Sequence, residues 1–351
     1  MPKNKFSKIS SIIQEAKKGK MFILVDDKNR ENEGDLIIPG SKCNSKSINF
    51  MAKHGRGLIC LALTRKQVET LKLPLMSSKN KSRMQTAFTI SIEAKRGIST
   101  GISAQDRAKT IKTAINPKVK KNDIVSPGHV FPLVARNGGV LERAGHTEAS
   151  VDISKLSKLN PSSVICEVMN EDGRMARLND LFKFSKKHKI KLASIEDLIS
   201  YRLKYEKLVN RLSSKTIKTK NGNKLNLFNY KNILENNINY VITKGKLNQK
   251  NSIPVRVLSN KLKDKNILKN KSVKNSLKAL IKYKNFLLLI INNNNSISKD
   301  SNINTLRYYG IGAQIIKDLN VKNMILISRS KKKIIGLDGF GLKIIKQIII
   351  K

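Results

Sequence analysis

The chain of 351 residues has no tryptophan, and aromatic residues make up only 5% of it. Cysteine is also scarce: Cys43, Cys60 and Cys166 show no paired spacing, which argues against a disulfide framework. No apolar run approaches the roughly 20 residues that a membrane-spanning helix needs, and the N-terminus has no apolar signal-peptide core. We therefore expect a cytoplasmic protein from a reducing compartment, with no membrane partner.

Acidic residues are few as well. The 25 Asp and Glu residues face 70 Lys and Arg residues, which gives a formal net charge of +45. Such an excess usually indicates nucleic acid or an anionic membrane as the partner. Here the cations are mostly dispersed Lys, and few aromatic rings are available for base stacking. We interpret the charge as a compositional bias, and we expect no nucleic-acid partner for the main function, although small phosphorylated substrates would feel the positive field.

The second half of the chain lacks the side chains that most often carry chemistry. Residues 1–205 hold 19 of the 25 acids, all three cysteines and all four histidines, whereas residues 206–351 hold six acids, 31 Lys and Arg, and neither His nor Cys. Histidine and cysteine are the usual transition-metal ligands, and they commonly serve as bases or nucleophiles near neutral pH. The sequence thus predicts two domains, 1–205 and 206–351, with the chemistry in the first.

Hydrophobic periodicity predicts mixed helices and strands. The run 10–20 has helical spacing, with a capping box at Ser11 and Gln14 and a C-terminal Gly19. A second capping box, at Ser103 and Asp106, opens a helix over 103–115. Without regular βαβ alternation, the pattern favours an α+β (complex α/β) fold. Further helices are expected over 175–188 and 194–212, a turn over 170–173, and strands over 21–25, 58–64, 87–94, 162–169 and 286–291.

Five of the acids lie in "DDKNRENEGD", directly after the apolar run "MFILV". If "RENEGD" is extended, Glu31, Glu33 and Asp35 project on one side, because strand side chains alternate. Three like charges at that spacing are tolerated when a cation neutralises them or one stays protonated. Mg²⁺ and Mn²⁺ prefer such carboxylate oxygens, and the neighbouring Arg30 suits a grip on an anionic oxygen. A solvated polar turn is the alternative, and this segment does not decide between them.

Two histidines follow glycine, His129 in "PGH" and His146 in "RAGHT". His146 is flanked by three residues that suit a phosphate or a polyol. Arg143 offers a guanidinium, Gly145 a close backbone approach, and Thr147 a hydroxyl. Each histidine can equally be structural, because a lone imidazole is a weak signal. Neither HExxH nor CxxC occurs anywhere, so no zinc motif is present.

One carboxylate falls inside an apolar strand pattern, Glu167 in "VICEVM". A buried carboxylate is costly unless it is paired or its pKa rises, and a raised pKa makes it suitable for acid–base work. An exposed strand-edge position is the alternative. Cys60 in "GLICLALT" also has two interpretations: it is either an ordinary core residue or part of a functional site.

Seven ordered motifs together resemble 3,4-dihydroxy-2-butanone 4-phosphate synthase of riboflavin biosynthesis, over roughly residues 6–203. They are "DDKNRENEGDLI", "RGLIC", "TAFTISIEA", "STGISAQDRAKTI", "PGHVFPL", "GGVLERAGHTEASVD" and "VICEVMNEDGRMARLNDL". The resemblance implies conversion of ribulose 5-phosphate to 3,4-dihydroxy-2-butanone 4-phosphate and formate. It also implies a homodimer that uses Mg²⁺ (or Mn²⁺), with two ions per active site.

Matching positions carry the family's site residues onto this chain. The resemblance makes Glu31 and His146 the metal ligands. It assigns catalysis to His129, Glu167, Glu33 and Cys60. Substrate contacts fall to Arg30, Glu31, Asp35, Thr100, Arg143, Ala144, Gly145, His146, Thr147 and Glu167.

The second half resembles GTP cyclohydrolase II in degenerate form. The segments "IPVRVLSN", "RYYGIGAQIIKDLNVKNMILIS" and "KKKIIGLDGFGLKI" carry this resemblance. The family's zinc-binding cysteine cluster is absent, so we expect no zinc and no cyclohydrolase activity. We therefore expect a smaller, degenerate α/β cyclohydrolase II-like domain. A binding module for RNA or an acidic partner is the alternative for this basic tail.

Overall fold

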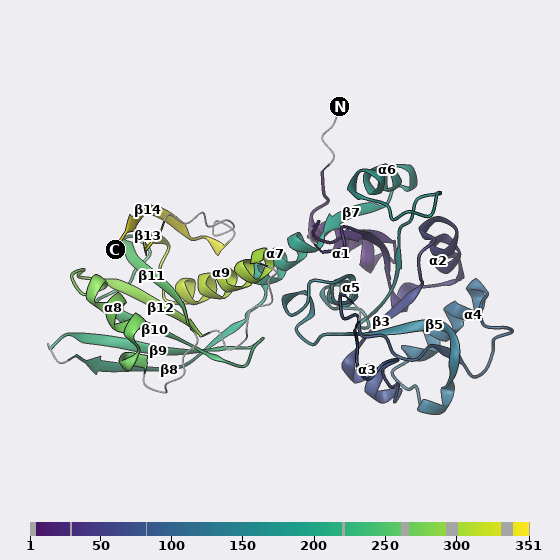
Figure 1. The fold of residues 1–351 in the computed structure, drawn as a ribbon, viewed down its shortest axis with the longest axis horizontal. Helices are drawn as coiled ribbons and strands as arrows, with labels where there is room; N and C mark the ends of the chain where they lie inside the picture. The colour runs from purple at the N-terminus through teal and green to yellow at the C-terminus, as the bar shows by residue number, and fades with distance from the viewer. Residues whose placement is uncertain are drawn as a thin grey trace. The chain divides into compact units, whose positions relative to one another are not determined.

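A computed structural model describes residues 5–28, 30–81, 83–219, 222–260, 267–292, 301–330 and 340–350. The chain forms two compact units, Met1–Ile199 and Ser200–Lys351, each built around its own mixed sheet (Figure 1). The α/β character expected of both halves is confirmed. The domain boundary at 205 stays a prediction, and most of "KKKIIGLDGFGLKI" lies outside the described residues.

The sheet of the first unit has the strand order β4-β5-β3-β6-β2-β1-β7. Its strands are β1 (Phe22–Val25), β2 (Gly34–Pro39), β3 (Cys60–Thr64), β4 (Ile92–Ala94), β5 (Ile124–Ala135), β6 (Ser162–Glu167) and β7 (Lys191–Ser194). Its helices are α1 (Ile9–Lys17), α2 (Ser45–Phe50), α3 (Arg65–Thr70), α4 (Ala104–Ala114), α5 (His146–Leu156) and α6 (Leu178–His188). Single turns of helix are η1 (Gly40–Lys42), the π-helical η2 (Met51–Gly55), η3 (Lys121–Asp123) and η4 (Gly139–Leu141).

Helix α5 is the central helix of this unit. Nine consecutive residues from its start are buried, and it packs on β2, β3 and β6. Strands β2 and β6 are antiparallel neighbours, and β1 pairs with β2 in the hairpin that carries the acidic turn. The end of β1, the start of β2, the end of β6 and the first turn of α5 therefore meet in one place.

Helix α1 has the predicted buried face and C-terminal glycine but not the predicted capping box. Ile9, Ile12, Ile13 and Ala16 are buried as their spacing predicts, and Gly19 ends the helix at φ +72°. The capping box at Ser11 is wrong, because the helix begins at Ile9. The Ser11 hydroxyl instead accepts a hydrogen bond from Lys191 Nζ at 2.5 Å.

Two further helices begin or end away from their predicted bounds. Helix α6 begins at Leu178 rather than 175, after the "NEDG" turn closed by Gly173 N–H donating to Asn170 O. Helix α7 (Ile195–Tyr205) ends before "VNRL", which begins strand β8 (Val209–Lys218). The prediction of a helix to 212 is wrong because that segment pairs with a neighbouring strand, a contact that local periodicity does not contain. The strand expected over 87–94 shortens to Ile92–Ala94.

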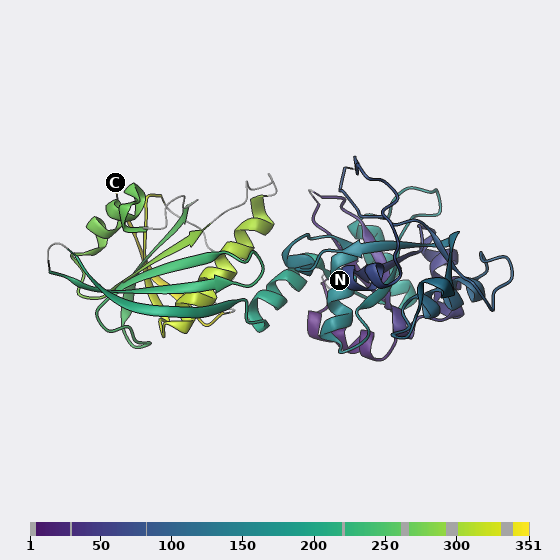
Figure 2. The same cartoon turned by 90° about the horizontal axis from the view of Figure 1, so that it is seen from below.

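The second unit has the strand order β14-β13-β11-β12-β10-β9-β8 (Figure 1). Figure 2 shows the same cartoon turned by 90°. Its elements are β8 (Val209–Lys218), β9 (Lys224–Asn232), β10 (Ile238–Lys244), β11 (Ser252–Asn260), η5 (Ile267–Lys269), α8 (Lys271–Leu280), β12 (Phe286–Asn292), α9 (Ser301–Asp318), β13 (Asn323–Ser328) and β14 (Lys343–Ile349). The order joins an antiparallel half, β8 to β10, to a parallel half, β11 to β14.

Strand β12 is the buried strand that "FLLLII" predicts. Its odd-numbered residues Leu287, Leu289 and Ile291 join the core with α9, while its even-numbered residues join the core with α8. Alternating side chains thus separate the two helices onto opposite faces of the sheet. Among the helices that the structure describes, none has the length and apolar character to cross a bilayer.

Candidate active site

The acidic segment after β1 forms a turn, so the structure decides against the extended alternative for the part of "RENEGD" that precedes Gly34. Arg30 N–H and Asn32 N–H both donate to Asp27 O, at 2.9 and 3.3 Å, and Asn32 is left-handed at φ 55°. Asn tolerates this conformation better than most residues. Only from Gly34 onward is the chain extended, as β2.

The carboxylate of Asp26 organises the turn. Its two oxygens accept the N–H groups of Glu33 at 2.9 Å and Glu31 at 3.2 Å. Arg30 Nη1 donates to the same carboxylate at 2.7 Å and also pairs with Glu31. Burial lowers the pKa of Arg30, but the charges of Glu31 and Asp26 outweigh it and the net pKa rises. Arg30 is therefore a firmly charged neighbour of both acids.

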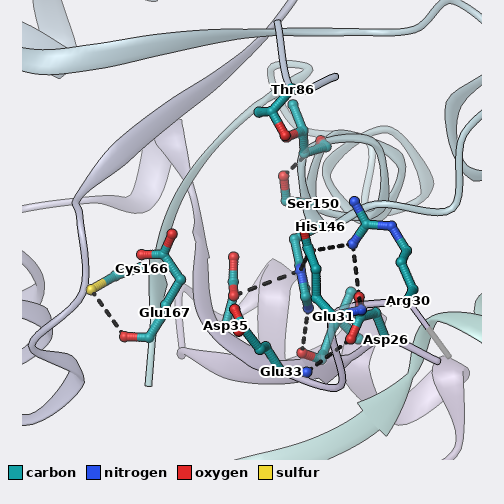
Figure 3. A network of polar contacts seen from close by, with 12 residues as sticks. Asp26, Arg30, Glu31, Glu33, Asp35, Thr86, His146, Ser150, Cys166 and Glu167 are labelled. Atoms are coloured by element: carbon teal, nitrogen blue, oxygen red, sulfur yellow. Dashed lines mark hydrogen bonds and ion pairs between the residues drawn. The ribbon is translucent and has the colours of Figure 1, made fainter. Parts of the chain in front are cut away.

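His146 lies on the other side of these acids, as the first residue of α5 (Figure 3). Its Nε2 lies 3.2 Å from Leu24 O, which assigns the ring proton to Nε2 and leaves the Nδ1 lone pair free. Nδ1 lies 3.7 Å from Asp35 Oδ1 and 4.0 Å from Glu31 Oε2. Burial lowers the pKa of His146, so the neutral imidazole that ligates metals is favoured.

Three of these side chains fit a divalent cation. One ligand atom from each of Asp26, Glu31 and His146 lies within 4.8 Å of the other two. Two carboxylates and one imidazole suit Mg²⁺ or Mn²⁺, both of which also keep bound waters. Asp26 is absent from the ligands assigned by sequence. The sequence feature that could have identified Asp26 is its position as the first acid after a buried strand.

Asp35 and Glu167 are directly opposite each other on β2 and β6. Asp35 is 3% exposed, and its Oδ1 has no hydrogen-bond partner among the described residues. Burial raises the pKa of Asp35 well above its ordinary value, and the charges of Glu167 and Glu31 add to the effect. Burial also raises the pKa of Glu167, although Leu58 N–H donates to its Oε2 at 2.8 Å. At least one proton is thus favoured between these two carboxyl groups.

Gly57 lets Glu167 lie this close to the chain. A Cβ at Gly57 would stand 2.5 Å from Glu167 Oε2 and 2.6 Å from its backbone oxygen. Cys60 is buried beneath the same place, and burial with the charges of Glu167 and Asp35 raises its thiol pKa. Cys60 is therefore a neutral thiol at neutral pH.

The guanidinium of Arg143 is already engaged. It pairs with Glu148 at 2.7 Å and donates to Met84 O at 3.0 Å and to Thr86 Oγ1 at 2.9 Å. A Cβ at the N-cap residue Gly145 would meet Arg143 Nη1 at 2.3 Å, so a larger residue there would make the Arg143 guanidinium shift. The buried Thr147 and the half-buried Ala144 flank His146 in the first turn and the preceding loop.

His129 lies in a second group. Its Nδ1 is 2.5 Å from Glu93 Oε1, and its side chain is 43% exposed. Thr100 is exposed beside Gly101, in a loop whose backbone donates to Asp106. Within the described part of the chain, no hydrogen bond or ion pair joins His129 to the group around His146. The structure therefore groups six of the predicted site residues: Arg30, Glu31, Glu33, Asp35, His146 and Glu167. His129 instead contacts Glu93, which the sequence analysis did not select.

The fold and this carboxylate–histidine group are those of a two-unit enzyme. A family model described as 3,4-dihydroxy-2-butanone 4-phosphate synthase matches residues 10–201, and one described as GTP cyclohydrolase II matches 291–349. The chain belongs to the 3,4-dihydroxy-2-butanone 4-phosphate synthase family. The partial second match is consistent with a degenerate cyclohydrolase-like unit.

Relatives cover nearly the whole chain. A 3,4-dihydroxy-2-butanone 4-phosphate synthase of Photobacterium phosphoreum is 42% identical, over 97% of this chain and 99% of its own. RibBX of A. baumannii, a two-domain synthase, matches with a TM-score of 0.81 and 38% identity, over 98% of this chain and 99% of its own. A synthase solved in complex with two magnesium ions is 37% identical with a TM-score of 0.55, covering 57% of this chain and 99% of that one.

Proposed function

We propose that the first unit converts D-ribulose 5-phosphate to 3,4-dihydroxy-2-butanone 4-phosphate and formate in riboflavin biosynthesis. The observation that carries this is the Asp26–Glu31–His146 donor set directly beside two buried carboxyls of raised pKa. The two products together contain all the atoms of the substrate, so the reaction needs neither an oxidant nor a reductant. Residues that move protons next to a site for a cation are sufficient.

The reaction requires several proton transfers at one sugar. A proton must leave the carbon beside the carbonyl to form an enediol, water must leave, and the carbon skeleton must rearrange. One water must then add back to a carbonyl carbon before that carbon departs as formate, so that no water is gained or lost overall. Asp35 and Glu167 suit these steps because their raised pKa values favour exchange of protons near neutral pH. Glu33, whose pKa is raised by burial and by Glu31, is a further acid–base group.

The Mg²⁺ or Mn²⁺ ions would be held by Glu31 and His146, with Asp26 as a third donor. When bound, such ions stabilise negative charge on substrate oxygens. His146 stays neutral and correctly turned through its Leu24 carbonyl contact. A helix N-terminus favours anions, so the first turn of α5 suits an anion such as the substrate phosphate. His129 would assist proton transfer through its contact with Glu93.

The first prediction concerns this cation site. With Mg²⁺ present, purified protein should release formate from ribulose 5-phosphate, and EDTA should abolish the release. Glu31→Gln and His146→Ala should each lower the rate by about 100-fold or more, as expected for loss of a charge-stabilising group. Glu171→Gln is the matched control, because the Glu171 side chain is 84% exposed. Full turnover in excess EDTA would contradict the metal assignment, and absence of formate with Mg²⁺ present would contradict the function.

We also propose a homodimer. In the first unit, Ile102 and Val125 are 53% and 41% exposed, near the group that contains Thr100 and His129. Apolar side chains exposed beside functional residues are typical of a surface that a second copy covers. Sedimentation of the full chain tests this, and a monomer at micromolar concentration would count against it.

The second unit carries no cyclohydrolase activity in this proposal. The whole segment after His188 lacks Cys and His, so it offers no zinc ligands of the usual kind. Purified protein should contain no stoichiometric zinc and should leave GTP unconsumed. The alternative of a nucleic-acid module would show as binding with a steep salt dependence that persists at physiological salt.

A further inference from the structure

Arg177 contacts the acidic turn from a distant part of the chain. It immediately precedes α6, and its Nη1 donates to Glu31 O at 2.8 Å and to Asn32 O at 2.7 Å. The same nitrogen lies 3.7 Å from Glu33 Oε1. One Nη atom carries two hydrogens, so both are used by consecutive carbonyls of the turn that holds a proposed cation ligand.

The turn is thereby held through both kinds of backbone group. Asp26 accepts the N–H groups of Glu31 and Glu33, while Arg177 donates to the carbonyls of Glu31 and Asn32. Without these bonds, the left-handed conformation of Asn32 would be weakly populated in the acidic loop between β1 and β2. No recorded contact within the described residues joins Arg177 to the Glu31 carboxylate, so that group is not neutralised by Arg177.

Arg177 is itself fixed by the helix that follows it. Its N–H donates to Asp180 Oδ2 at 3.1 Å, which caps the first turn of α6. One turn further on, Leu181 is fully buried, and a Cβ at Gly34 would meet its Cδ1 at 2.6 Å. Helix α6 thus rests on the start of β2 and presents Arg177 to the turn from a rigid element.

We propose that Arg177 is a positioning residue that orders the Glu31 turn for divalent-cation binding. The proposal rests on the cation site assigned above. Pre-ordering a ligand loop removes part of the entropy cost that binding otherwise carries, so it strengthens binding without any contact to the ion. Charged donors to carbonyls are the stronger class of hydrogen bond, and two of them act here at short distance.

Mn²⁺ is the probe for this proposal, because electron paramagnetic resonance counts free Mn²⁺ without any need for turnover. Arg177→Met should weaken Mn²⁺ binding by about fivefold to tenfold, the scale of one lost charge-assisted hydrogen bond at a half-exposed site. Arg177→Lys retains a cationic donor but not the planar guanidinium, so its Mn²⁺ affinity should lie between those of the wild type and Arg177→Met. Arg174→Met is the matched control, since the Arg174 side chain is 84% exposed and pairs with the nearby Asp172.

Kinetics and amide exchange separate positioning from a general structural role. At saturating Mg²⁺, Arg177→Met should recover most of the wild-type kcat, and its defect should appear as a raised Mg²⁺ requirement. In EDTA, amide exchange should quicken in residues 26–33 of Arg177→Met and stay unchanged in α5. Equal Mn²⁺ affinity in wild type and Arg177→Met would overturn the proposal while leaving the cation site intact.

The remaining outcomes are also decisive. Wild-type affinity in Glu31→Gln would remove the cation site itself, and the role of Arg177 with it. Loss of folded protein in both Arg177→Met and Arg177→Lys, measured by circular dichroism in EDTA, would assign Arg177 to global stability and would overturn the positioning role.

Discussion

Burial sets the chemistry of individual residues in this site more than neighbouring charge does. Desolvation is the largest influence on the pKa of Asp35, Glu167 and His146, and in each case it favours the neutral form. A neutral carboxyl group can donate a proton to a substrate, and a neutral imidazole presents a lone pair. The site is costly to fold for the same reason, as buried polar groups in functional sites commonly are.

At the residue scale, we expect Gly57 to affect the reaction rate through the position of the Glu167 carboxylate. Gly57→Ala inserts a methyl group 2.5 Å from Glu167 Oε2, so the carboxylate must move. We expect formate release to fall by about 100-fold, the lower range for a displaced acid–base group. Glu167→Gln, which keeps the shape, should lose at least as much. The double variant should be no slower than Glu167→Gln alone; additive losses would show that Gly57 acts elsewhere.

At the scale of elements, a polar cluster connects the antiparallel half of the second sheet to α9. Tyr230 of β9 is fully buried and donates its hydroxyl to Asp318 Oδ2 at 2.6 Å. Arg211 of β8 pairs with the same oxygen at 2.6 Å. Burial raises the pKa of Asp318, but the Tyr230 hydrogen bond and Arg211 outweigh it, so the net pKa is lowered. The charged form of Asp318 therefore stabilises the folded unit.

This cluster gives a pH-dependent prediction. Asp318→Asn should destabilise the second unit by about 1–2 kcal/mol near neutral pH, with the half-exposed Arg211 pair contributing little. Because the folded pKa is below the ordinary value of 3.8, the wild-type advantage is full above pH 3.8 and is lost as the pH falls through the folded value. Amide exchange of β8 and β9 in both proteins at pH 7 and near pH 3 measures it. A difference that grows on acidification would contradict the assignment.

At the scale of the whole molecule, the candidate site lies in the first unit, whereas the second unit is rich in Lys and lacks His and Cys. Every residue of the candidate site lies in Met1–Ile199, where the acids concentrate against a background of +45. The second unit has two cores of its own around β12. We propose that it serves the stability or assembly of the chain rather than catalysis.

This separation predicts that the first unit works without the second. A protein ending at Lys204 keeps nearly all of α7 and should retain formate release within about threefold of the full chain, because no site residue is removed. Sedimentation of both proteins should show the same oligomer if the exposed surface of the first unit forms the dimer. Loss of activity with retained circular dichroism would instead assign a role in catalysis to the second unit.

Much of the site was readable from sequence because the informative residues are chemically unusual for their positions. Glu167 inside an apolar strand, the acids after "MFILV" and the "RAGHT" segment are conspicuous in a chain that is poor in acids and histidine. The Ser103 N-cap was also predicted from the sequence, and it is confirmed because Asp106 N–H donates to Ser103 Oγ at 3.0 Å. These are signals carried by residues a few positions apart.

The sequence by itself therefore determined the family, the alternation of helices and strands, and most of the residue types in the site. Only the tertiary structure decided that "RENEGD" turns rather than extends, that Asp26 joins Glu31 and His146, and that Arg177 reaches the same turn. The physical reason is range. Periodicity and capping are local, whereas these contacts join residues as much as 146 positions apart, and the burial that sets their pKa values exists only once the sheet and α5 have packed.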